Sequence, residues 1–66
     1  MTVSEIETYI NEHIIGLHAE RNRDIVRDKL IVGLSIKDIA DKHHLSPTRV
    51  KTVIRTFKRM VDTLEK

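Results

Sequence analysis

Basic and threonine side chains recur in the second half of this 66-residue chain at spacings that suit contact with nucleic acid. Six basic residues and no acidic residue lie between Lys42 and Arg59, both included. Arginine bonds guanine bidentately, the threonine methyl fits the methyl of thymine, and cationic side chains neutralise phosphates. On a helix that turns about 100° per residue, one side collects Thr48, Lys51, Thr52, Arg55 and Arg59. An ordinary solvated surface is the other interpretation of such a face.

The opposite side of the same segment is apolar. A stripe at helical spacing runs along it and consists of Val50, Val53, Ile54, Phe57, Met60, Val61 and Leu64. Ser46 can cap this helix with its hydroxyl, and Pro47 suits the first helical position, where no N–H donor is needed. No glycine or further proline follows, so one long helix is expected over about residues 47–64.

A shorter helix is expected just before the long one. Ser35 can cap it, Asp38 three residues later gives a variant of the capping box, and Gly33 ends the preceding helix. The helix then covers about residues 36–43, and Leu45 in the following turn is expected to fill the corner of the core. Two helices joined by a tight turn form a helix-turn-helix, in which the second helix enters the DNA major groove.

This helix pair resembles a known DNA-binding family. Gly33–Ala40 reads GLSIKDIA and Leu45–Lys51 reads LSPTRVK. The two stretches are similar to the pattern G-L-S-x-x-E-I-A and L-S-x-x-T/R-V-K shared by bacterial sigma factor region four and LuxR-type regulators. The resemblance covers about residues 20–61 and implies that the helix from Pro47 is the recognition helix. The family often has glycine where this chain has His44, a residue type that tolerates a left-handed backbone. The uninterrupted long helix favours the sigma-like branch, or a small stand-alone regulator built on it.

Together these features predict a sequence-specific regulator of transcription that binds double-stranded DNA. Four residues are expected to read bases, namely Thr48, Arg49, Thr52 and Arg55. Lys37 and Lys42 are expected to touch the flanking backbone. The full set of predicted DNA-binding residues is Lys37, Lys42, Ser46, Thr48, Arg49, Lys51, Thr52, Arg55, Lys58 and Arg59.

The N-terminal segment predicts another amphipathic helix. Its apolar positions recur at helical spacing and are Ile6, Ile10, Ile14 and Leu17. Its start offers two candidate capping boxes, Thr2 with Glu5 and Ser4 with Glu7. Gly16 either ends this helix or weakens a longer one.

The polar stretch His18–Arg23 is the expected linker, and Asn22 can cap a second helix that ends near Val32. No segment alternates with period two, so no sheet is expected. The predicted fold class is all-α, a small four-helix domain with helices over about residues 3–15, 22–32, 36–43 and 47–64. Residues 1–66 form one domain, with an extra N-terminal helix in residues 1–18 and a helix-turn-helix core in residues 22–66.

The far end of the apolar stripe needs a cover, because it lies beyond the reach of a short helix pair. The residues concerned are Phe57, Met60, Val61 and Leu64. The N-terminal helix is expected to cover them, and their near-heptad spacing is also compatible with the interface of a homodimer. Residues 1–33 carry a net charge of −2 and residues 34–66 a net charge of +4. The basic half suits contact with nucleic acid. A third possible role of the acidic N-terminal helix is to dock on an RNA polymerase subunit.

Catalytic and metal chemistry find little support in the chain. It has no cysteine, which excludes disulfides and thiolate metal sites. His43 and His44 are adjacent and point about 100° apart on a helix, and His13 and His18 lack the helical i, i+4 spacing of a zinc site. No glycine-rich phosphate loop or nucleophile elbow is present. We therefore expect no enzymatic activity, no metal and no cofactor.

No apolar run reaches membrane length and no signal-peptide pattern opens the chain, so a cytoplasmic protein without a membrane partner is expected. The competing function is a protein-interaction module, an anti-activator or adaptor whose basic face binds an acidic partner such as a polymerase subunit. The start of the long helix, Ser46–Arg49, favours DNA, because a partner-binding helix does not need a small, polar and basic first turn beside a tight turn.

Overall fold

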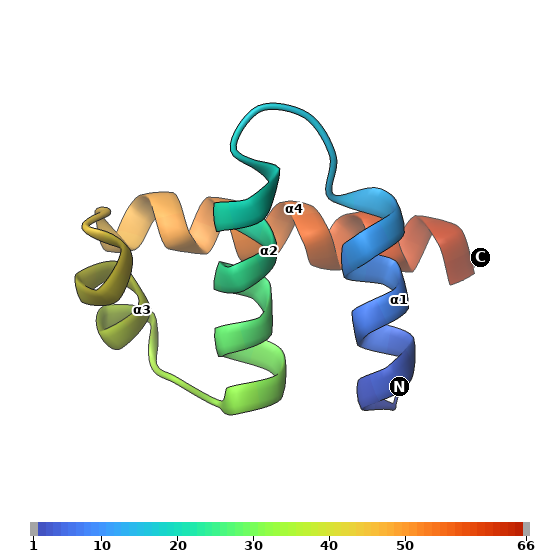
Figure 1. The fold of residues 1–66 in the computed structure, drawn as a ribbon, viewed down its shortest axis with the longest axis horizontal. Coiled ribbons are helices and arrows are strands. Elements are labelled where there is room, and N and C mark those ends of the chain that lie inside the picture. The colour runs from blue at the N-terminus through green and yellow to red at the C-terminus, as the bar shows by residue number, and fades with distance from the viewer. Residues whose placement is uncertain (1, 66) are drawn as a thin grey trace.

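A computed structural model describes the backbone of residues 2–65 and the side chains of residues 2–64 (Figure 1). Within these residues there are four α-helices and no strand. The helices are α1 (Val3–His13), α2 (Ala19–Arg27), α3 (Ile36–His43) and α4 (Pro47–Glu65), and α2 continues into the π-helical turn η1 (Asp28–Val32). The predicted all-α, four-helix fold class is confirmed.

The helices α1 and α2 lie side by side and antiparallel, and both cross the long helix α4 on the same side (Figure 1). Helix α3 packs against the N-terminal end of α4, beyond α2. This arrangement leaves the side of α4 that points away from α1 and α2 without a covering helix.

Two clusters of buried side chains hold the helices together. The first joins α1, α2 and α4 and consists of Ile10, Ile14, Val26, Phe57 and Val61. The second joins α2, α3 and α4 and consists of Ile25, Ile39, Ala40, Val50 and Ile54. The adjacent residues Ile25 and Val26 place α2 in both clusters, so α2 connects the two halves of the core. Fully burying an aliphatic side chain of this size contributes about 1.5–3 kcal/mol.

Side-chain caps begin three of the helices where the sequence predicts them. At α1, the Thr2 hydroxyl accepts from the Glu5 N–H at 3.1 Å and the Glu5 carboxylate accepts from the Thr2 N–H at 3.2 Å. This reciprocal pair is the capping box that was expected there as one of two alternatives. At α3, the Ser35 hydroxyl accepts from the Asp38 N–H at 3.1 Å. At α4, the Ser46 hydroxyl accepts from the Arg49 N–H at 3.2 Å.

The connection between α1 and α2 differs from the prediction. Helix α1 ends at His13 rather than at residue 15, because Ile14 takes an extended backbone that turns its side chain into the first cluster. Helix α2 begins at Ala19, so the linker is residues 14–18 and not His18–Arg23. Asn22 is not a cap, since it lies inside α2 and its N–H donates to the His18 carbonyl at 3.0 Å.

Leu17 also departs from its predicted place on the apolar face of the first helix. The linker turns at Gly16, which has a φ of +92°, and Leu17 is 86 % exposed. The chain has already left the helical path at Ile14, and the left-handed backbone, readily available to glycine, turns the linker at Gly16 just before Leu17.

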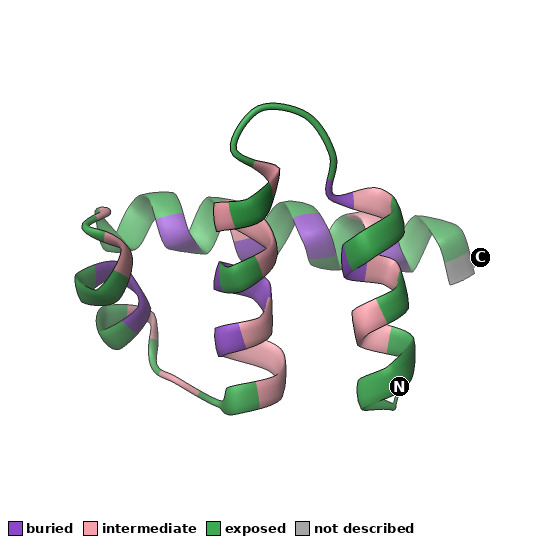
Figure 2. Ribbon diagram, viewed as in Figure 1, coloured by how far each residue is buried: buried purple, intermediate pink, exposed green. Residues whose placement is uncertain are grey.

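The apolar stripe of α4 is part of the core of its own chain. Phe57 and Val61 are buried beneath α1, and Met60 packs against the same cluster while partly exposed. Figure 2 shows buried bands recurring along α4 between exposed ones. The N-terminal helix α1 therefore covers the far end of the stripe, as predicted. Leu64 is the exception, because 48 % of it stays exposed.

Candidate nucleic-acid interface

The turn between α3 and α4 is short and tightly hydrogen bonded. His44 caps the end of α3 with a left-handed backbone (φ 56°, ψ 43°). The Leu45 N–H donates to the Ala40 carbonyl at 2.9 Å, and the Leu45 side chain packs against the second cluster. Ser46 then caps α4. His44 thus adopts the left-handed conformation expected at this turn, and Leu45 fills the corner as expected.

Every predicted DNA-binding residue on α4 is exposed. These residues are Thr48, Arg49, Lys51, Thr52, Arg55, Lys58 and Arg59. The opposite side of the helix holds Val50 and Ile54 in the core. Thr48, Thr52, Arg55 and Arg59 follow one another at spacings of three or four residues and share one exposed side of α4. Arg49 lies on the flank beside α2, whereas Lys51 and Lys58 lie on the other flank, toward η1 and the start of α3.

The cations on this part of α4 have no carboxylate partners among the described side chains. None of the ion pairs found there includes Arg49, Lys51, Arg55, Lys58 or Arg59. The Thr52 hydroxyl donates to the Thr48 carbonyl at 3.0 Å, and this bond fixes the side-chain rotamer of Thr52. Five cations on one helix repel one another, and an anionic partner would relieve that repulsion.

The predicted contacts outside the body of α4 have different surroundings. Lys37 is exposed in the first turn of α3. The Ser46 hydroxyl accepts the capping bond from Arg49, so part of its bonding capacity is used within the chain. The ammonium of Lys42 is paired with a carboxylate, because its Nζ lies 3.1 Å from Oδ1 and 3.0 Å from Oδ2 of Asp28.

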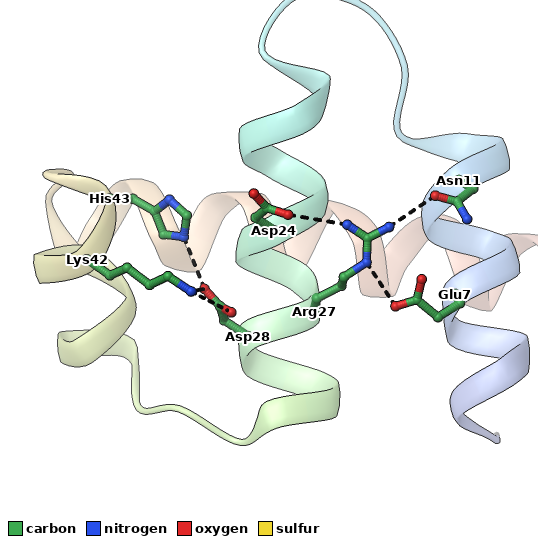
Figure 3. Close-up of polar contacts among 7 residues, drawn as sticks. All are labelled: Glu7, Asn11, Asp24, Arg27, Asp28, Lys42 and His43. Carbon is green, nitrogen blue, oxygen red and sulfur yellow. Dashed lines mark hydrogen bonds and ion pairs between the residues drawn. The ribbon is translucent and has the colours of Figure 1, made fainter.

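Asp28 is not among the predicted site residues. It lies in η1, and its side chain is 8 % exposed. Besides Lys42, its carboxylate meets Nε2 of His43 at 3.1 Å (Figure 3). Its backbone carbonyl accepts from the N–H groups of Gly33 and Leu34, each at 2.9 Å. We call Asp28, Lys42 and His43 the Asp28 cluster.

The electrostatics of the Asp28 cluster follow from these contacts. Burial alone would raise the pKa of Asp28, but the hydrogen bonds and charges of His43 and Lys42 outweigh burial and hold that pKa below its ordinary value. Asp28 is therefore ionised at neutral pH. Because an ionised carboxylate only accepts hydrogen bonds, Nε2 of His43 must carry the proton that is shared with it.

The Asp28 cluster fixes the last turn of α3 to η1, next to the turn that starts α4. His43 consequently faces inward, and its side chain is 12 % exposed. The sequence held one indication of the cluster. Asp28 follows Ile25 by three residues, which places a carboxylate on the buried face of the helix.

A second polar group ties α1 to α2. Nε of Arg27 lies 2.9 Å from Oε1 of Glu7, and its other nitrogens reach Asn11 Oδ1 at 3.1 Å and Asp24 Oδ1 at 3.3 Å (Figure 3). The carboxylates of Glu7 and Asp24 are thus both paired with the Arg27 guanidinium.

Among the described side chains, those of residues 2–64, no group of three or more histidine or acidic residues is placed to hold a metal ion. No helix of that part of the chain is both long and apolar enough to cross a membrane. No protein-family model, curated protein or solved structure matches the chain. Its function must therefore be inferred from its own side chains.

Proposed function

We propose that this chain is a sequence-specific regulator of transcription, and that the N-terminal half of α4 enters the major groove of double-stranded DNA. The observation that carries the proposal is the exposed part of α4 between Thr48 and Arg59, where five cations have no described carboxylate partner. The opposite face of α4 contributes to both core clusters, so the basic face keeps a fixed orientation.

The dimensions and charges of α4 support this placement. An α-helix with its side chains is about 10–12 Å across, and the major groove is about 12 Å wide. The carboxylate nearest the basic face along the helix is Asp62, an exposed residue three positions beyond Arg59. An acidic residue there is compatible with DNA contact only if the end of α4 lies away from the phosphates, so we place the contact between Thr48 and Arg59.

Different residues have different roles in this proposal. The base readers are those nearest the start of α4, namely Thr48, Arg49, Thr52 and Arg55. Phosphates are contacted by Lys51, Lys58 and Arg59. Lys37, in the first turn of α3, contacts the DNA backbone. We assign Lys42 to positioning rather than to phosphate contact, because its ammonium is bonded to both carboxylate oxygens of Asp28.

The similarity of Gly33–Lys51 to sigma factor region four supports the same use of the second helix of the pair. In that proposal the acidic helix α1 is available to a polymerase subunit, since Glu5 and Glu12 on it are exposed. A homodimer is the alternative way to lengthen the recognised sequence, because one short helix reads few base pairs.

The competing proposal is a protein-interaction module with an acidic partner. One observation favours it: the linker carries two exposed aliphatic residues, Ile15 at 74 % and Leu17 at 86 %. Exposed apolar side chains of this size are common anchors in protein interfaces. The basic face would then be the rim of a protein contact instead of a DNA contact.

The experiment that separates the two proposals is selection of bound sequences from a pool of random DNA duplexes, repeated at several salt concentrations. The wild-type chain is compared with Arg55→Ala and with Arg23→Gln. Arg23 carries the same charge as Arg55 but lies on α2, where its guanidinium donates to the Asn11 carbonyl.

We expect wild type and Arg23→Gln to enrich one common motif, and Arg55→Ala to lose the preference at one or two positions of it. A palindromic motif would identify a homodimer. Binding without any enriched motif would reject sequence-specific reading. The absence of binding at low salt would reject DNA as the partner and leave the protein-interaction module.

A further inference from the structure

A hollow of about 310 Å³ lies beside α4 and is lined by four cations and two isoleucines. Lys29 comes from η1, and Ile36 is the first residue of α3. The remaining lining residues are on α4 and are Lys51, Ile54, Arg55 and Lys58. Lys29 lies outside the helix-turn-helix pair and is not among the predicted DNA-binding residues.

The charges around this hollow are unbalanced. No acidic side chain lines it, and none of its four cations takes part in an ion pair among the described side chains. On α4, Arg55 follows Lys51 by four residues and Lys58 follows Arg55 by three, which are the spacings at which like charges face each other and destabilise a helix. Lys29 adds a fourth positive charge from a different element.

The aliphatic stems of the four cations can pack along Ile36 and Ile54, but their charged ends have no counter-charge in the chain, and an anion at the hollow would supply one. The first turn of α3 adds to the positive field, because Ile36 lines the hollow and the first N–H groups of a helix have no partners within it. The Ser35 hydroxyl meets only one of these groups, the Asp38 N–H. Phosphate is the anion that suits lysine ammonium groups together with a helix N-terminus.

We propose that this hollow holds a phosphate of the DNA backbone beside the groove that α4 enters, and that Lys29 contacts it. This inference rests on the proposed function and extends it to a residue of η1. Arg55 borders the hollow and also lies among the proposed base readers, so the hollow marks where the backbone passes the reading face. Lys29, Lys51 and Lys58 then fix the register of α4 along the duplex without reading sequence.

The test measures how the DNA-binding constant falls with salt for wild type, Lys29→Gln, Lys29→Arg and the control Arg23→Gln. The slope of log K against log salt is negative, and losing one phosphate contact makes it less negative by about 0.9 for double-stranded DNA. We expect that change in Lys29→Gln only, with Lys29→Arg and Arg23→Gln keeping the wild-type slope. The affinity of Lys29→Gln should fall by the same factor on a selected duplex and on a scrambled one.

The melting temperature of the free protein gives a second readout. Lys29→Gln should melt at the same temperature as wild type or higher, because it removes a charge that others repel. A wild-type slope in Lys29→Gln would overturn the assignment of Lys29 and leave the proposed function standing. A wild-type chain that binds no duplex at low salt would overturn both.

Discussion

Nε2 of His43 lies 3.1 Å from Oδ2 of Asp28, although the two residues are 15 positions apart in the chain. The contact joins the end of α3 to η1, one residue before the left-handed backbone of His44. It therefore ties the last turn of α3, which precedes the start of α4, to η1. This polar pair adds to the second cluster of buried side chains, which packs α3 and α4 against α2.

Replacing Asp28 by asparagine should destabilise the fold. The substitution keeps the shape of the side chain but removes the charge that holds Lys42 and His43. The free energy of unfolding should fall by about 1–3 kcal/mol, the usual cost of leaving hydrogen-bonding groups unsatisfied at a buried site. Urea denaturation followed by circular dichroism measures it. Asp41→Asn is the matched control because Asp41 is exposed on α3, and its effect should stay within about 0.5 kcal/mol. Equal stability of the two variants would contradict this role of Asp28.

The same contact makes stability depend on acid pH. The pKa of Asp28 is lower in the folded chain than its ordinary value, so unfolding takes up a proton in the acid range. The contribution is complete above the unfolded pKa of about 3.9 and is lost as the pH falls below it toward the folded pKa. Urea denaturation at a series of pH values from about 3 to about 7 measures the free energy of unfolding of wild type and of Asp28→Asn. That free energy should fall more steeply toward acid pH in wild type than in Asp28→Asn. Parallel declines would argue against an ionised, hydrogen-bonded Asp28.

Much of the fold follows from local rules that the sequence displays. Ser46 and Pro47 start α4, and the His44 turn precedes it, because each depends only on neighbouring backbone groups. The sequence predicts a helix start at Asn22, but α2 begins at Ala19, because a residue that can cap does not act as a cap when helix begins before it. The inward direction of His43 depends on Asp28, and a pairing across 15 positions is not visible in local patterns. The role of Lys29 likewise depends on how η1 packs beside α4.

Val50→Asp should unfold the domain. Val50 is fully buried in the second cluster, and an unpaired carboxylate there costs several kcal/mol. A domain of this size has a total stability of only about 3–10 kcal/mol. Circular dichroism and thermal melting should show loss of the cooperative transition. Val32→Asp is the control, because Val32 is 65 % exposed, and it should melt as wild type does. A folded Val50→Asp variant would contradict the observed orientation of α4.

Arg55→Ala should weaken binding to the selected duplex by about 1–3 kcal/mol if Arg55 makes a bidentate contact with guanine. The fold should be unaffected, because Arg55 is exposed. Equilibrium titration on the selected duplex and on a scrambled one measures the difference, with Thr63→Ala near the end of α4 as a control that should bind normally. A loss of the same size on both duplexes would make Arg55 a phosphate contact instead of a base reader.

The central claim is that the exposed face of α4 is the surface that binds duplex DNA. We would titrate the isotopically labelled chain with the selected duplex and follow the backbone amide resonances by NMR. The account predicts that the largest shifts fall on Thr48–Arg59, with further shifts at Lys29 and Lys37. Resonances of Thr8, Glu12 and Glu20, which are exposed on α1 and α2, should stay in place. Shifts concentrated on the Ile14–His18 linker or on α1, with α4 unchanged, would contradict it.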